Sequence, residues 1–82
     1  MKINDAIRKA MKEKGFTQAQ MAKAIGKPSA NAVGARLTSD SLSTNNVVEM
    51  LDVIGYELVV QPKTQGQRKE GSMVIEKGTK WQ

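Results

Sequence analysis

The chain has 82 residues and a formal net charge of +5, with 13 Lys and Arg against 8 Asp and Glu. It contains neither cysteine nor histidine, which excludes disulfides, thiol nucleophiles, the commonest general base and most transition-metal sites. We therefore expect one small domain that is not an enzyme and binds no metal or cofactor, and whose basic balance suits either phosphate binding or simple solubility.

The first helix is predicted over about residues 4–14. Its apolar side chains fall on one stripe at helical spacing, and they are Ile3, Ile7, Ala10 and Met11. Gly15 follows directly and is a natural stop, because glycine adopts positive φ without a steric penalty.

The second helix has the strongest start signal in the chain. Thr17 can cap its first turn, and Gln20, three residues later, can reach back to complete a capping box. Phe16 and Met21 flank this box at the spacing of a hydrophobic staple. We expect the helix to extend to the residue before Gly26, which ends it.

A turn through Lys27 and Pro28 leads into the third helix, with Ser29 as the predicted N-cap. Its inner face carries Ala30, Val33 and Leu37. The residues that point away are small or polar, and they are Asn31, Ala32, Ala35 and Arg36. Gly34 in mid-helix costs about 1 kcal/mol relative to alanine. Close approach of another backbone or of DNA is one explanation for it, and neutral drift is another.

The fourth helix is predicted to begin at Ser43, with Leu42 and Val47 as a second staple, and to end at Gly55. Residues 56–61 are rich in strand-forming side chains and are closed by a proline. Residues 72–76 could form a second short strand that folds back on the first.

A lone hairpin is marginal in water, and its free edge invites pairing with another chain. We therefore expect a homodimer in which two copies join these segments. The predicted dimer interface consists of Tyr56, Leu58, Val59, Val60, Met73 and Ile75. The last residues, which include Trp81, are expected to form a tail.

When two short helices pack against each other and the second has small and polar residues on its outer face, that second helix can enter the DNA major groove. The residues that carry this pattern are Gln18, Ala22, Gly26, Val33 and Leu37, and they resemble the Cro and phage-repressor type of helix-turn-helix. The resemblance covers roughly residues 3–55, although the turn is one residue longer than in the best-known phage repressors. The stretch IGYELVVQP also resembles small bacterial and prophage regulators in which a strand follows the last helix.

The expected fold is mainly α. A four-helix helix-turn-helix domain would occupy residues 1–55, and residues 56–82 would supply a C-terminal β-strand or hairpin for dimerisation, and a tail. The N-terminal half of residues 29–37 would lie in the major groove, while the preceding helix crosses the DNA backbone.

Contact roles follow from that geometry. Predicted base contacts are Ser29, Asn31, Ala32 and Ala35. Asn31 is the main reader, because its amide can donate and accept on an adenine edge. Predicted phosphate contacts are Gln18, Lys27, Arg36 and Asn45, with Gln18 helped by the positive end of its helix. Each of these has a plainer alternative as a solvated surface residue or a good helix former.

The preferred function is a double-stranded DNA-binding transcriptional regulator, and in the first instance a repressor. It would bind a near-palindromic operator with half-sites about 34 Å apart. The alternative is an antitoxin or phage-encoded interaction module that neutralises a partner protein through the tail at residues 61–82. RNA binding ranks third, because the chain lacks aromatic-rich strands for stacking bases.

Cellular location is inferred only by exclusion. No apolar stretch approaches the roughly 20 residues of a membrane span. The N-terminal residues alternate charged and apolar side chains, unlike a secretory signal. The expectation is therefore the cytoplasm of a bacterium or of a phage-infected cell.

Overall fold

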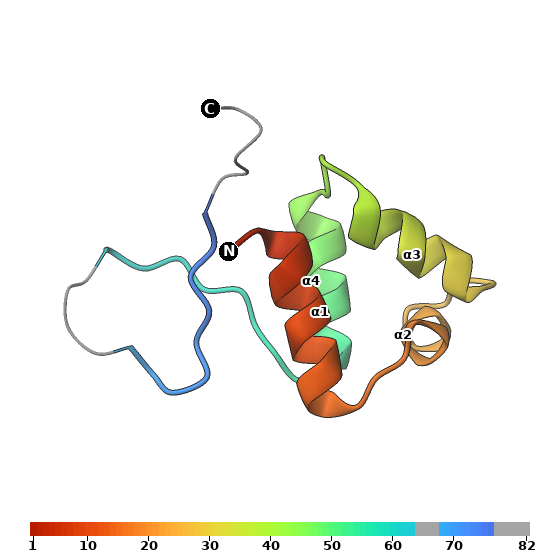
Figure 1. Ribbon diagram of the computed structural model, residues 1–82, viewed down its shortest axis with the longest axis horizontal. Helices are drawn as coiled ribbons and strands as arrows, with labels where there is room; N and C mark the ends of the chain where they lie inside the picture. Colours follow the sequence, from red (N-terminus) through yellow and green to blue (C-terminus); the bar gives the residue numbers. More distant parts are fainter. Residues whose placement is uncertain (64–67, 77–82) are drawn as a thin grey trace.

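The computed structural model describes residues 1–63 and 68–76 of the chain. Four helices occur within them: α1 (Ile3–Lys14), α2 (Gln18–Ala24), α3 (Ala30–Thr38) and α4 (Thr44–Val53). α1 and α4 lie side by side, while α2 and α3 pack together at one side of that pair (Figure 1). The predicted mainly α architecture with four helices is thus confirmed.

Local capping sets where α2 and α4 begin. The hydroxyl of Thr17 accepts a hydrogen bond from the Gln20 backbone N–H at 3.1 Å, and the Gln20 side chain accepts one from the Thr17 backbone at 2.8 Å. This is the predicted capping box. Ser43 caps α4 by accepting from the backbone of Asn46 at 3.1 Å. Ser29 occupies the N-cap position of α3, but its side chain accepts no capping hydrogen bond.

The turn between α2 and α3 depends on Gly26, whose φ is 76°. This left-handed conformation reverses the chain, and the backbone N–H of Lys27 then donates to the carbonyl oxygen of Ala22 at 2.8 Å. The reversal brings α3 back against α2 after only a few residues.

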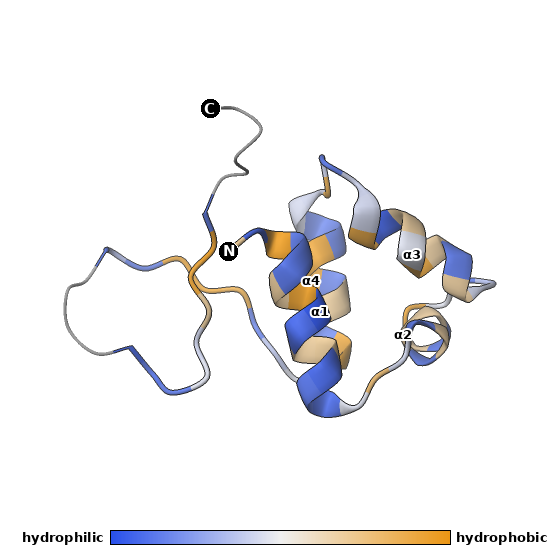
Figure 2. Ribbon diagram, viewed as in Figure 1, coloured by the Kyte–Doolittle hydropathy of each residue, from blue (hydrophilic) through white to orange (hydrophobic). Residues whose placement is uncertain are grey.

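One hydrophobic core joins the four helices. Each helix carries apolar residues on part of its surface and polar residues on the rest (Figure 2). The core consists of Ile7, Ala10, Met11, Met21, Ala22, Val33, Leu37, Val47, Met50, Leu51 and Ile54. None of the helices in the described residues is both long and apolar enough to cross a bilayer.

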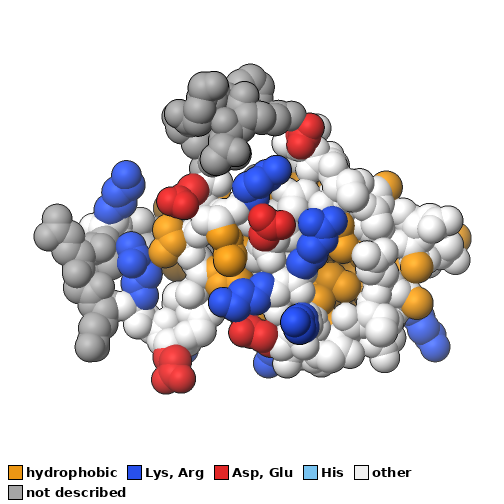
Figure 3. All heavy atoms as spheres, in the orientation of Figure 1, with side chains coloured by type: hydrophobic (Ala, Val, Ile, Leu, Met, Phe, Trp, Pro, Cys, Tyr) orange, Lys and Arg blue, Asp and Glu red, His pale blue; other side chains and the backbone are white. Residues whose placement is uncertain are grey.

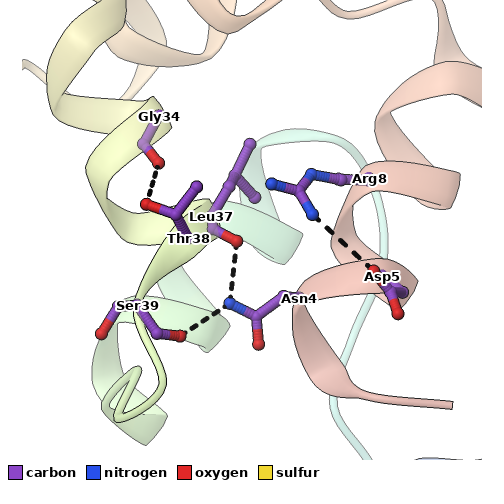
Figure 4. A network of polar contacts seen from close by, with 7 residues as sticks. All are labelled: Asn4, Asp5, Arg8, Gly34, Leu37, Thr38 and Ser39. Carbon is purple, nitrogen blue, oxygen red and sulfur yellow. Dashed lines mark hydrogen bonds and ion pairs between the residues drawn. The ribbon is translucent and has the colours of Figure 1, made fainter.

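A buried amide ties the start of α1 to the end of α3. Nδ2 of Asn4 donates to the carbonyl oxygens of Leu37 and Ser39, each at 2.9 Å (Figure 4). Terminal carbonyls of a helix lack partners within the helix, so this side chain satisfies groups that burial would otherwise penalise. Sequence analysis placed Asn4 only as the first residue of a helix and missed this role.

The predicted strands at 56–61 and 72–76 are not borne out, since the described residues after Gly55 form neither helix nor strand. The second segment pairs with the N-terminus instead. The α-ammonium of Met1 donates to the carbonyl oxygen of Val74 at 3.1 Å and lies 3.2 Å from the Glu76 carboxylate, and the Glu76 N–H donates to the Met1 carbonyl at 2.8 Å. Strand-forming composition alone does not make a ladder, because a strand also needs a neighbouring chain segment. Trp81 lies outside the described residues.

Replacing Asn4 with alanine should destabilise the domain by about 1–3 kcal/mol, because two carbonyl oxygens lose their donor. The free energy of unfolding from urea titration followed by circular dichroism is the measurement. Asn31→Ala removes the same amide from an exposed site and serves as the matched control, with an expected change within about 0.5 kcal/mol. Equal stability of the two variants would contradict the assigned role of Asn4.

Candidate nucleic-acid interface

Among the helix pairs, α2 and α3 make the most extensive contact. Met21 and Ala22 of α2 are buried, as are Val33 and Leu37 of α3. The small side chain of Ala22 is 3% exposed, which suits close packing of the two helices. These contacts fix which side of α3 faces the core, and therefore which side faces outward.

The outer face of α3 carries Asn31 and Ala35, which are both exposed. Successive helical residues are about 100° apart, so Asn31 and Ala35 lie within about 40° of each other, opposite the buried Val33 and Leu37. Ser29 is exposed just before the helix begins. Ala32 is half-buried and lies further round the helix. Asn31 and Ala35 thus share one accessible face of α3, and Ser29 is accessible next to the start of that helix.

Arg36 is placed differently from Asn31. Its guanidinium lies 2.7 Å from the Glu49 carboxylate of α4, and its side chain is only 14% exposed. The helical spacing puts it about 140° from Asn31, on the flank that meets α4. The predicted phosphate contact would have to compete with this ion pair, so the geometry gives Arg36 a structural role in holding α3 against α4.

Gln18 lies next to the middle of α3. A Cβ added at Gly34 would lie 3.2 Å from Oε1 of Gln18, closer than an ordinary van der Waals contact. The neighbour of Gly34 is therefore a side chain of α2, and not the backbone of another element that the sequence suggested as one explanation. This proximity places the Gln18 amide beside the exposed face that carries Asn31.

Two other predicted phosphate contacts are exposed. Lys27 lies in the turn between α2 and α3, and Asn45 lies in the first turn of α4. Together with Gln18, they come from the segments that precede and follow α3.

A surface depression adjoins Gln18 and was missed by sequence analysis. It lies between α1, the start of α2 and the end of α3, and its lining residues are Arg8, Met11, Lys12, Phe16, Gln18 and Leu37. Lys and Arg side chains, interspersed with acidic ones, are scattered over the face of the molecule that carries α1 (Figure 3). Arg8 and Lys12 belong to α1 and Gln18 belongs to α2, so their proximity is visible only in the folded structure.

The predicted dimer interface contains two kinds of residue. Large apolar side chains are exposed at Leu58, Val59, Val60 and Ile75, whereas Met73 is half-buried against the core. Tyr56 is held within its own chain, since its hydroxyl donates to the Glu13 carboxylate at 2.7 Å. That hydrogen bond, with a smaller effect of desolvation and of the Glu13 charge, raises the pKa of Tyr56 above its ordinary value of 10.0.

No group of three or more acidic side chains among the described residues could hold a metal ion. Comparisons of the chain with protein-family models, with curated proteins and with solved structures found no match.

Gly34→Ala should stabilise the domain by about 0.5–1 kcal/mol, because alanine favours the helix and the exposed Gln18 side chain can move aside. Thermal or urea unfolding measures this change. Gly26→Ala is the opposing control, since a side chain at positive φ should lower stability by about 1 kcal/mol. Destabilisation by Gly34→Ala would show that Gln18 cannot yield.

Proposed function

We propose that the chain is a double-stranded DNA-binding transcriptional regulator, in the first instance a repressor, that acts as a homodimer. The observation that carries the proposal is the exposed outer face of α3, with Asn31 and Ala35 at its centre and Gln18 beside it. The resemblance of α2 and α3 to the Cro and phage-repressor type of helix-turn-helix supports the same function.

The dimensions of α3 suit this role. An α-helix with its side chains is about 10–12 Å across and the major groove is about 12 Å wide, so α3, whose nine residues extend over about 13 Å, can lie in it. Small side chains at Ser29 and Ala35 allow close approach to base edges. The Asn31 amide supplies the donor and acceptor pair that an adenine edge requires.

The charge around α3 is compatible with a polyanion. Glu49 of α4 lies against the flank of α3, where Arg36 neutralises it at 2.7 Å. Lys27 leaves a positive charge in the turn that leads into α3. The domain therefore presents neutral polar side chains to bases and positive charge to phosphates.

Dimerisation is proposed through the segment after Gly55. Val60 is 97% exposed, and neighbouring apolar side chains at Leu58 and Val59 are exposed with it. Figure 2 shows this segment and the one near residue 75 as apolar stretches outside the helical core. Pairing these segments between two copies would cover the apolar side chains that a single chain leaves exposed.

A second candidate is an antitoxin or phage-encoded module that binds and neutralises a partner protein through the tail at residues 61–82, where Val74 and Ile75 are exposed. A partner in place of a second copy would leave the isolated chain monomeric. Sedimentation at increasing concentration distinguishes the two candidates. The proposed regulator should form a homodimer without any partner, whereas the interaction module should remain monomeric.

Selection of bound fragments from a pool of random duplex DNA tests the proposed function. We expect enrichment of a near-palindrome with half-sites about one helical turn apart. A pool that stays random after repeated selection would contradict sequence-specific binding.

Asn31→Ala and Lys27→Ala should weaken DNA binding in different ways. Loss of a base contact should reduce affinity for the selected site by about 1–3 kcal/mol and relax the choice at one base pair. Loss of a phosphate contact should weaken selected and random duplexes alike and reduce the slope of log affinity against log salt by about 0.9. Fluorescence anisotropy on both duplexes at several salt concentrations measures these effects. Equal losses for Asn31→Ala on both duplexes would exclude it as a base reader.

Val60→Asp should shift the dimer toward monomer, because a charge would have to be desolvated in the interface. Val48→Asp is the matched control, since Val48 is an exposed valine on α4, outside the proposed interface. Analytical ultracentrifugation of both variants provides the comparison. A Val60→Asp dimer as tight as that of the unmodified chain would refute this interface.

A further inference from the structure

The depression between α1, the start of α2 and the end of α3 has an apolar floor and a basic rim. Met11, Phe16 and Leu37 supply the apolar part, and Arg8 and Lys12 supply the positive charge. The two cations are four residues apart on α1, so they project from the same side of that helix.

Both cations are available for a ligand. The Arg8 side chain is 47% exposed and extends from α1 toward α3, on the side of Leu37 (Figure 4). Its ion pair with Asp5 is long, at 3.7 Å, and both side chains are well exposed. Exposed pairs of this kind hold a side chain only weakly. Lys12 is exposed and forms no ion pair within the part of the chain that the structure describes.

The depression is continuous with the surface proposed to read DNA. Gln18 lines it and also lies against Gly34 of α3, the helix that carries Asn31. A duplex lying on α3 would therefore bring the backbone that flanks the groove toward this side of the molecule. The neighbouring cations of α1 would then face phosphate.

We propose that Arg8 and Lys12 bind a phosphate of the DNA backbone on the flank of the site that carries Gln18. This inference rests on the proposed function and adds α1 to the elements that contact DNA. Such a contact would position α3 in the groove without distinguishing one base pair from another. It should therefore contribute equally to the affinity for every DNA sequence.

The test uses Arg8→Gln and Lys12→Gln in the full chain, with Lys9→Gln as the matched control. Lys9 is exposed on the same helix but does not line the depression. Because the two cations share one phosphate, each of the first two variants should lower the salt slope by at most about 0.9 and weaken selected and random duplexes alike, by up to about tenfold near 0.1 M salt. Lys9→Gln should retain nearly all affinity, and Lys12→Arg should keep the slope of the unmodified chain.

Thermal melting of every variant checks that the fold is intact, so that a loss of affinity reports a lost contact. If the unmodified chain binds DNA and both test variants behave like Lys9→Gln, the phosphate site on α1 is wrong and the proposed function stands. If the unmodified chain binds neither a selected nor a random duplex, the proposed function and this inference fall together.

Discussion

The fold of the proposed site depends on the burial of α2 against α3. A helix of seven residues is unstable in isolation, because nucleation is costly and few hydrogen bonds follow it. The capping box of Thr17 and Gln20 satisfies the first turn, but the larger stabilisation comes from burying Met21 and Ala22. That packing fixes the rotation of α3 about its own axis. The exposure of Asn31 is a direct consequence of it.

Contacts within the domain are made at the two flanks of α3, so they leave its outer face exposed. On one flank, Arg36 is occupied by Glu49 of α4. On the other, Gln18 lies against Gly34, where the absence of a Cβ leaves room for the amide. Asn4 closes the far end by holding the last carbonyls of α3. The outward side chains between these contacts are small or polar, which suits a surface that must approach another polymer closely.

Local signals predicted most of the helical fold. Thr17 with Gln20, Ser43 and Gly26 act within a few residues of their own position, so their roles can be inferred from spacing alone. The roles of Asn4, Glu49 and Arg8 depend on partners or neighbours from other elements, and no local pattern reveals them. The strand prediction at residues 56–61 used composition without a known neighbour, and residues 74–76 pair with Met1. Periodicity alone predicted which face of α3 is exposed. That Asn31 stays exposed on this face while Arg36 is paired with Glu49 could be seen only from the packing of α3 against α4.

The most direct test of DNA binding by the outer face of α3 is to map the surface that meets DNA by nuclear magnetic resonance. Isotope-labelled protein would be titrated with a selected duplex, and backbone amide shifts would be followed residue by residue. We expect the largest changes at Ser29, Asn31 and Ala35 and at Gln18, with little change along the buried side of α4. Changes confined to residues 56–63 and 68–76, with the outer face of α3 unaffected, would contradict DNA binding by that face.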